Sequence, residues 1–247
     1  MPRAFRSWTF LLTLLVLCWS AGAQAATVLL RQARVADPDS GQVRSVDVLL
    51  RDGRIAAIDA RLRAPRGARV VEAEGLALLP GLFDVHTHWT PNARPAALPA
   101  VANAYLDAGV TTVADYHQPP EAYAPRRAWL AQVAAPTVFL GARVSTPLGH
   151  GADWGDQSTT RWVNSPAAAR AAVRELAAYR PDFIKAFTDG WRYNNYPDNT
   201  SMDEATLAAL VEEAHAHGIR VFTHTVTLAR AKQAARAGVD LIAHSIL

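Results

Sequence analysis

Short apolar runs separated by turn residues fill residues 26–77 of the chain. Three of these runs, at 28–30, 46–50 and 55–58, have the length and the apolar content of β-strands. Asp52-Gly53 lies between the last two runs, and this dipeptide between apolar runs is a strong β-hairpin signal. The pattern predicts a small β domain over residues 26–77.

From residue 78 onwards, segments with helical spacing alternate with short apolar runs. Helices are expected at five places, namely 98–108, 121–134, 165–179, 203–217 and 227–237. Ser165 and Ser201 are expected at helix starts, the second within a Ser-x-x-Glu capping box that ends at Glu204. The apolar runs predict strands that end near His88, Tyr116, Ser145, Phe187, His224 and His244. Repeated βα units of this kind imply a parallel sheet.

A TIM-like (β/α)8 barrel fits this alternation, but only six βα units can be placed. Such a barrel typically has about 250 residues, whereas residues 78–247 number 170. The expected fold class is therefore α/β, an incomplete TIM-like barrel over residues 78–247 preceded by the small β domain. Because strands seven and eight are not found, we expect a fragment or a truncated product that is inactive by itself.

The first 25 residues predict a secretory signal peptide. Arg3 and Arg6 give a basic start, residues 8–19 form a short apolar core, and the small residues at 23–25 fit a cleavage site. A membrane anchor is the alternative, but this core is shorter than the roughly 17 residues that a spanning helix needs. We therefore expect a periplasmic protein without a stable membrane anchor.

Composition excludes two classes of function. The chain has 25 basic and 22 acidic residues and one cysteine, and this cysteine lies in the expected signal peptide. The basic residues do not form a stripe with aromatic residues, so we expect no nucleic-acid partner. Without the cysteine, the mature chain has no thiol nucleophile.

Two histidines, His86 and His88, lie at the end of an apolar run that opens with Pro80-Gly81. Residues i and i+2 of a β-strand point to the same side of the sheet. The two imidazoles could therefore hold one metal ion between them. The alternative is a pair of structural histidines at the end of a strand.

Three more residues with suitable chemistry lie near the ends of later apolar runs, namely Lys185, His224 and His244. In a parallel barrel the C-terminal ends of the strands gather at one face, and barrel enzymes have their active sites there. We therefore expect these three residues to lie close to the His86 and His88 pair, although they are far apart in sequence.

Together these segments resemble the metal-dependent amidohydrolase superfamily, in particular its imidazolonepropionase-like and prolidase-like members. The resemblance covers residues 27–247 and rests on the strand that ends at His224 and on the motifs at 79–88, 109–113, 181–185 and 237–244. It implies a barrel of the amidohydrolase type. It also implies hydrolysis of amide-like C–N bonds with two divalent metal ions, zinc being the expected metal.

The resemblance further implies a set of ligands, in which His86 and His88 bind one metal and His224 and His244 bind the other. A protonated amine has no lone pair for a metal, so the resemblance implies that Lys185 is carboxylated and bridges the two ions. Lys185 and Lys232 are the two lysines among the 25 basic residues. Lysine is therefore rare in this chain, and its occurrence at position 185 is informative. The alternative is that the Lys185 stem crosses apolar surface to reach solvent.

Other candidate residues lie in loops. Similar proteins place a histidine in the loop after the third strand, so His150 is expected to polarise the substrate carbonyl, with a solvated loop histidine as the alternative. His117, directly after the second strand, is expected to be an ordinary loop histidine, with a place near the active face as the alternative. Arg192, Tyr193 and Tyr196 are candidates for binding a substrate carboxylate, with packing against the barrel rim as the equal alternative. The aspartate that ends strand eight in the family has no counterpart in the sequence.

The expected function is hydrolysis of a cyclic amide, an N-acylated amino acid or a dipeptide, with a small molecule as the partner. One alternative is a mononuclear deaminase or imidazolone-type hydrolase in which Lys185 is structural. Another is a non-catalytic truncated fragment. A homo-oligomer is also considered.

Overall fold

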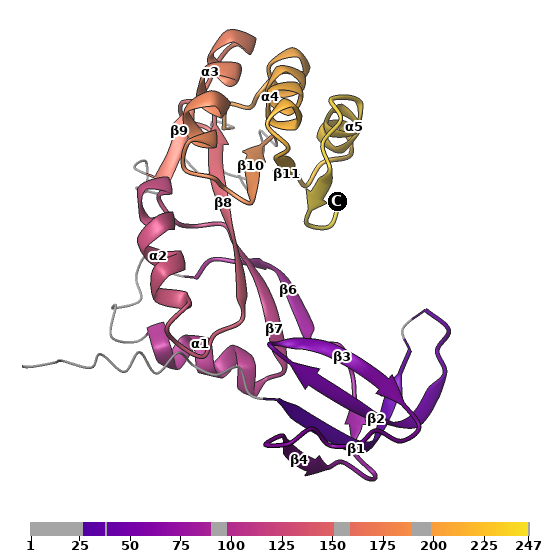
Figure 1. The fold of residues 1–247 in the computed structure, drawn as a ribbon. Helices are drawn as coiled ribbons and strands as arrows, with labels where there is room; N and C mark the ends of the chain where they lie inside the picture. The colour runs from indigo at the N-terminus through magenta and orange to yellow at the C-terminus, as the bar shows by residue number, and fades with distance from the viewer. Residues whose placement is uncertain (1–26, 38, 90–97, 151–158, 189–198, 247) are drawn as a thin grey trace, which may run out of the picture. The chain divides into compact units, whose positions relative to one another are not determined.

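The computed structural model describes residues 27–37, 39–89, 98–150, 159–188 and 199–246. The chain divides into two compact units, Met1–Pro80 and Gly81–Leu247, and each is described by itself (Figure 1). Within the described ranges, no helix has the length and apolar content that a membrane span requires. The expected signal peptide at residues 1–25 lies outside the described residues.

The first unit contains a five-stranded sheet in the order β3-β2-β1-β4, with β5 paired to β1. The strands are β1 Val28–Ala36, β2 Val43–Arg51, β3 Arg54–Asp59, β4 Arg69–Glu72 and β5 Ala77–Leu78. Strands β2 and β3 are antiparallel, and the turn residues Asp52 and Gly53 have φ angles of 52° and 70°. Positive φ at both positions is what a two-residue type I′ turn requires, so the predicted hairpin is confirmed.

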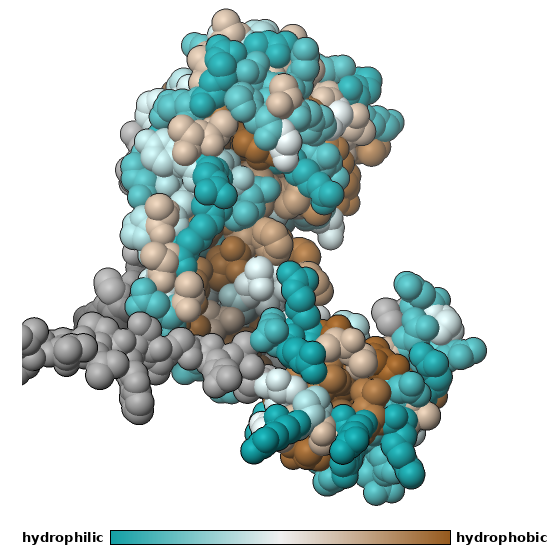
Figure 2. Space-filling model, viewed as in Figure 1, coloured by the Kyte–Doolittle hydropathy of each residue, from teal (hydrophilic) through white to brown (hydrophobic). Residues whose placement is uncertain are grey.

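Apolar side chains gather on the sheet of the first unit (Figure 2). A hollow of about 510 Å³ there is lined by Leu30, Val48, Ile55, Ile58 and Leu79, among others. Ile55 and Leu79 are 63% and 64% exposed. Among the described residues, this sheet therefore leaves a substantial apolar surface accessible.

The second unit is an α/β fold on a parallel sheet in the order β12-β11-β10-β8-β7-β6, with β9 paired to β8. The strands are β6 Leu82–Thr87, β7 Val110–Asp115, β8 Thr137–Ser145, β9 Thr160–Trp162, β10 Phe183–Phe187, β11 Arg220–His224 and β12 Leu241–Ala243. The outermost strands β6 and β12 approach each other at their C-terminal ends, where the rings of His86 and His244 are 4.6 Å apart between centroids. The sheet is thus nearly closed into a barrel, and the expected fold class is confirmed.

Helices connect the strands, as the alternating pattern predicts. They are α1 Leu98–Asp107, the 3₁₀ helix η2 Pro120–Ala122, α2 Tyr123–Leu130, α3 Pro166–Ala177, α4 Glu204–Ala216 and α5 Leu228–Arg236. Ser165 is the N-cap of α3, as predicted. The predicted capping box at Ser201 is wrong, because Asp203 is the N-cap of α4 and its side chain accepts the Thr206 N–H at 2.7 Å. The helix therefore begins at Glu204, and the Asp203 carboxylate rather than the Ser201 hydroxyl caps it.

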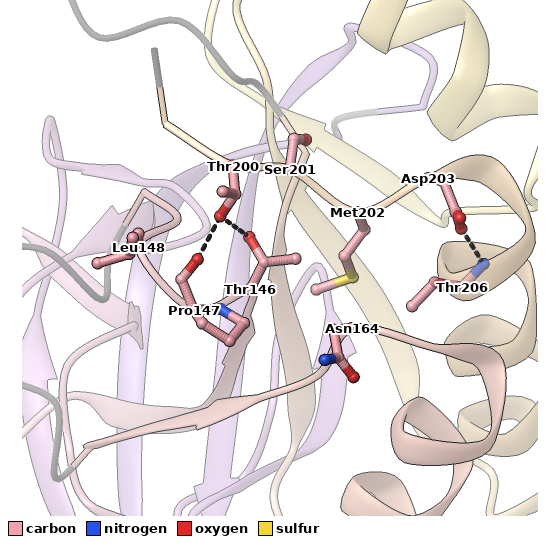
Figure 3. Close-up of a pocket in the computed structure, with 9 residues that line it drawn as sticks. All are labelled: Thr146, Pro147, Leu148, Asn164, Thr200, Ser201, Met202, Asp203 and Thr206. Atoms are coloured by element: carbon pink, nitrogen blue, oxygen red, sulfur yellow. Dashed lines mark hydrogen bonds between the residues drawn. The ribbon is translucent and has the colours of Figure 1, made fainter. Parts of the chain in front are cut away.

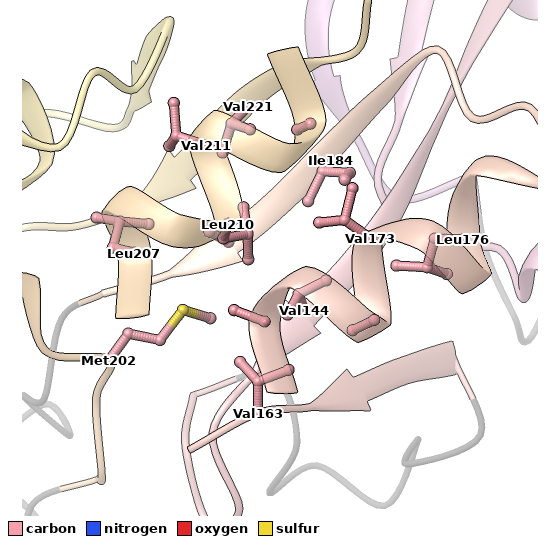
Figure 4. Close-up of a cluster of buried hydrophobic side chains, with 14 of the residues drawn as sticks. Val144, Val163, Val173, Leu176, Ile184, Met202, Leu207, Leu210, Val211 and Val221 are labelled. Atoms are coloured by element: carbon pink, nitrogen blue, oxygen red, sulfur yellow. The ribbon is translucent and has the colours of Figure 1, made fainter. Parts of the chain in front are cut away.

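The main core of the second unit lies between the sheet and helices α3 and α4 (Figure 4). Ile184 and Ala186 of β10 belong to this core, together with Leu176 of α3 and Leu210 of α4. Every residue of β10 is buried, and alternate residues of a strand point to opposite sides. Lys185 therefore points away from the helices, toward the interior of the barrel.

One carboxylate joins the C-terminal ends of β6 and β7. The Oδ1 atom of Asp115 accepts the backbone N–H of Trp89 at 3.1 Å and that of His117 at 3.0 Å. Asp115 is fully buried, and Nη2 of Arg126 lies 3.8 Å from its Oδ2. Burial raises the pKa of Asp115, while the two backbone N–H groups and Arg126 oppose that rise. This carboxylate therefore fixes the two chain segments that carry His88 and His117.

We expect Asp115→Ala to lower the free energy of unfolding by about 2–6 kcal/mol, because two backbone N–H groups each lose an acceptor worth about 1–3 kcal/mol. Asp115→Asn keeps an oxygen at this position and should cost less. Urea denaturation followed by tryptophan fluorescence measures both variants. Asp107→Ala, at an exposed carboxylate of α1, is the control, and equal losses in Asp107→Ala and Asp115→Ala would contradict this role.

Candidate functional site

His86 and His88 converge at the C-terminal end of β6. His86 lies within the strand and His88 is the first residue after it. Their Nε2 atoms are 3.3 Å apart, so the predicted placement of both rings on one side of the strand is confirmed.

This spacing fits a shared metal ion. Two imidazole nitrogens that each lie about 2.0–2.1 Å from a tetrahedral zinc are about 3.3–3.4 Å from each other. Desolvation lowers the pKa of His86 to about 3, with the positive charge of Lys185 acting in the same direction. Desolvation also lowers the pKa of His88 to about 4, and His117 adds to this shift. Both rings are therefore neutral at pH 7, as a metal ligand must be.

His224 and His244 extend the cluster from the neighbouring strands. His224 is the last residue of β11 and is 4% exposed, and His244 directly follows β12. The His244 ring lies 4.6 Å from the rings of both His86 and His224, between centroids. The four histidines expected to bind metal thus form one continuous group of rings.

Lys185 lies inside the barrel. It is 2% exposed, so the alternative in which its amine reaches solvent is wrong. Its Nζ is 4.5 Å from the centroid of the Tyr116 ring and 5.7 Å from that of Phe187. Its positive charge also acts on His86. The structure therefore brings Lys185 to the histidine cluster, as the sequence predicts.

His150 joins the same cluster through the loop after β8. Its ring centroid is 3.9 Å from that of His224, and its ring stacks on Phe187 at 5.4 Å. The Ser145 hydroxyl donates to the backbone carbonyl of His150 at 2.8 Å, which holds the loop at the barrel end. The other predicted substrate contacts, Arg192, Tyr193 and Tyr196, lie outside the described residues.

Two residues of the site, Tyr116 and Arg143, were not predicted from the sequence, and His117 lies there too, as the alternative to a loop histidine had it. Tyr116 stacks on His86 at 4.1 Å between ring centroids. His117 Nδ1 lies 3.3 Å from Nδ1 of His88, and the buried Arg143 places Nη1 3.4 Å from Nε2 of His117. Arg143 could have been noticed in the sequence, because a charged residue within the otherwise apolar run of β8 is buried only when it has a partner.

Within the described residues, the side chains of the cluster are not close enough together to form a complete metal site. No group of three or more His, Cys, Asp or Glu side chains there lies close enough together to hold a metal ion. Among the four predicted metal-binding histidines, His86 and His88 have nitrogen atoms at the separation expected for shared ligands. The remaining rings approach this pair through ring contacts.

A separate pocket of about 440 Å³ lies beside the loop that leads to His150 (Figure 3). Its lining includes Thr146, Asn164, Thr200 and Met202. Thr146 and Thr200 share a hydrogen bond of 2.7 Å between their hydroxyls, which ties the loop after β8 to the segment before α4. The lining contains none of the predicted metal ligands, so this pocket is distinct from the histidine cluster.

Comparison with known proteins gives relatives for parts of the chain. An adenine deaminase of Deinococcus deserti is 38% identical over 98 residues, which are 39% of this chain and 17% of the deaminase. A dihydroorotase of Geobacter sulfurreducens is 43% identical over 61 residues, which are 25% of this chain and 14% of that enzyme. The chain thus matches less than a fifth of the length of these relatives.

Solved structures extend the similarity to almost the whole chain. A prolidase complexed with N-methylphosphonate-L-proline superposes with a TM-score of 0.75 at 23% identity, over 90% of this chain and 62% of the prolidase chain. The family model described as "Amidohydrolase family" matches residues 77–245, a range that includes all four clustered histidines and Lys185. The chain belongs to the amidohydrolase family.

Proposed function

We propose that this chain provides the metal-binding part of a hydrolase that cleaves amide-like C–N bonds. The observation that carries the proposal is the meeting of His86, His88, His224 and His244 with the buried Lys185 at the C-terminal ends of the barrel strands. Divalent ions such as zinc supply an activated water at neutral pH and polarise a scissile carbonyl. The relatives named dihydroorotase and adenine deaminase support this reaction class.

In this proposal the residues divide between two ions. His86 and His88 would hold the first ion through their neutral Nε2 atoms, which are 3.3 Å apart. His224 and His244 contribute to the second. The third element of the centre is Lys185, whose amine is buried beside these rings.

Carboxylation of Lys185 resolves an electrostatic conflict. A buried ammonium beside two bound cations is costly, because burial and like charges both disfavour the charged amine. The neutral amine nitrogen can instead add to the carbon of carbon dioxide and lose one proton to solvent. The resulting carbamate would carry a negative charge and two oxygens with which to bind the metal centre.

His150 is proposed to orient the substrate. Its ring lies against His224 and Phe187, so it is next to the second pair of ligands and at the mouth of the barrel. A ring N–H there can donate to the carbonyl oxygen of the scissile bond. The proposed substrate class is a cyclic amide, an N-acylated amino acid or a dipeptide, and the prolidase with its bound N-methylphosphonate-L-proline is in line with the last of these.

A mononuclear deaminase is the second candidate function. It is favoured by the adenine deaminase match and by the close approach of Nε2 of His86 to Nε2 of His88, which is enough for one ion. In that case one ion binds and Lys185 has a structural role. Metal content distinguishes the two candidates.

We also propose a periplasmic location. The basic start, the apolar core at residues 8–19 and the small residues at 23–25 support an exported precursor. Amino-terminal sequencing of the protein recovered from the periplasmic fraction would test this location.

The metal content of the full chain should be about two zinc ions per chain, as in two-metal hydrolase sites. Lys185→Ala should lower it to one or fewer, because the bridging ligand is lost. Lys232→Ala is the matched control, since Lys232 is the second lysine and is exposed. Elemental analysis after gel filtration measures the ratio. One ion per chain with no effect of Lys185→Ala would contradict the bridge and favour the deaminase.

A carbamate on Lys185 should be visible directly. Incubation of the zinc-loaded chain with ¹³C-labelled bicarbonate should give a carbamate carbon signal in the ¹³C NMR spectrum. The signal should persist in Lys232→Ala and be absent in Lys185→Ala. A signal of equal intensity in both variants would show that carboxylation is not specific to Lys185.

The proposed substrate site should bind N-methylphosphonate-L-proline only when zinc is present. The tetrahedral phosphorus of this compound imitates the transition state of amide hydrolysis. His150→Ala should weaken binding by about tenfold or more, which corresponds to a lost hydrogen bond of about 1.5 kcal/mol. Isothermal titration calorimetry measures the affinity, with the exposed His217→Ala as the control. Equal affinity with and without zinc would contradict the assignment.

A further inference from the structure

Both ring nitrogens of His88 face another imidazole. Its Nε2 lies 3.3 Å from Nε2 of His86, which is the side of the proposed metal. Its Nδ1 lies 3.3 Å from Nδ1 of His117, and the two rings meet edge to face at an interplanar angle of 72°. His117 thus occupies the position from which a side chain can control the orientation of this ligand.

His117 is itself held in place from two sides. Its backbone N–H donates to the buried carboxylate of Asp115 at 3.0 Å. On the side of the ring that faces away from His88, Nη1 of Arg143 lies 3.4 Å from Nε2. Arg143 is 2% exposed, and the same Nη1 donates to the Thr159 hydroxyl at 2.9 Å. A loop residue with this much support is not an ordinary surface histidine.

A histidine that binds a metal through Nε2 keeps its proton on Nδ1. That N–H needs an acceptor, and its partner sets both the tautomer and the orientation of the ring. Nδ1 of His117 is the nitrogen that faces Nδ1 of His88 in the structure. We propose that His117 is a positioning residue for the metal ligand His88. This inference rests on the metal centre of the proposed function.

The positions of the ring protons of His88 and His117 follow from this role. A guanidinium can only donate, so without metal Arg143 donates to Nε2 of His117. The His117 proton then lies on Nδ1 and points to Nδ1 of His88, whose own proton lies on Nε2. Were Nε2 of His88 to bind metal, its remaining proton would lie on Nδ1 and would be donated to Nδ1 of His117. The His117 proton would then lie on Nε2, where Arg143 can no longer donate to it, so each ring would keep one proton and the hydrogen bond from Arg143 to His117 would be lost.

The test measures zinc affinity of the full chain by competition with a chromophoric chelator. His117→Phe keeps a flat ring but removes the acceptor, and we expect it to weaken zinc binding about 10–100-fold, as loss of such a partner does. His117→Asn offers an amide oxygen as acceptor and should recover part of the affinity. His217→Phe is the matched control, because His217 is exposed on the last turn of α4.

The ¹⁵N NMR spectrum of the histidine rings provides a second readout. Addition of zinc should move the protonated nitrogen of His117 from Nδ1 to Nε2, and Arg143→Met should favour the zinc-bound tautomer even without metal. Zinc affinity unchanged in His117→Phe, or a His117 tautomer indifferent to zinc, would overturn the inference and leave the proposed function standing. A parent chain that binds no zinc at its histidines would overturn both.

Discussion

The parallel register of the barrel strands is the constraint on which the whole site depends. Phe187 of β10 pairs with His224 of β11, and His224 pairs with Ala243 of β12, one residue before His244. Side chains in register on neighbouring parallel strands point to the same side of the sheet. A shift of one residue in β10 or β11 would turn Lys185 or His224 to the opposite face. These two candidate ligands therefore meet because the strands pair in this register, whereas His244 lies beyond the end of β12, where its φ of 104° departs from strand geometry.

Partial burial and neighbouring positive charges act on the charge state of these side chains. They favour the neutral forms of His86 and His88, and the neutral imidazole is the form that binds a metal. Lys185 is placed beside them in the same interior, against the faces of two aromatic rings. An interior that favours neutral imidazole and disfavours ammonium is suited to the proposed conversion of the amine into a carbamate.

Much of the fold, and the convergence of the candidate residues at the strand ends, could be predicted, because both depend on local periodicity. The two-residue period of a strand predicts that His86 and His88 share a side, and the alternation of helices and strands predicts that later strand ends meet them. The close approach of His117 to His88 could not be predicted. It depends on two hydrogen bonds that the Asp115 carboxylate accepts from backbone N–H groups in separate loops. The role of Arg143 is apparent only from its contacts with His117 and Thr159 in the folded chain.

The errors at the level of elements have similar causes. Ser201 satisfies the capping-box pattern, but α4 begins at Glu204, and the adjacent Asp203 caps it by accepting the Thr206 N–H. Strand β9 has three residues, too few for any period to be visible, and it forms because β8 extends far enough to pair with it. The N-cap of α4 and the pairing of β9 both depend on which nearby residues make a hydrogen bond, and the pattern of apolar and polar positions does not contain this information.

Anomalous diffraction at the zinc absorption edge, on crystals of the zinc-loaded chain, tests the central claim most directly. The claim predicts the strongest peak within bonding distance of Nε2 of both His86 and His88, with a second peak next to His224 and His244. A peak at a surface pair such as His215 and Asp240, whose side chains approach to 2.9 Å, with none at the barrel end, would contradict it.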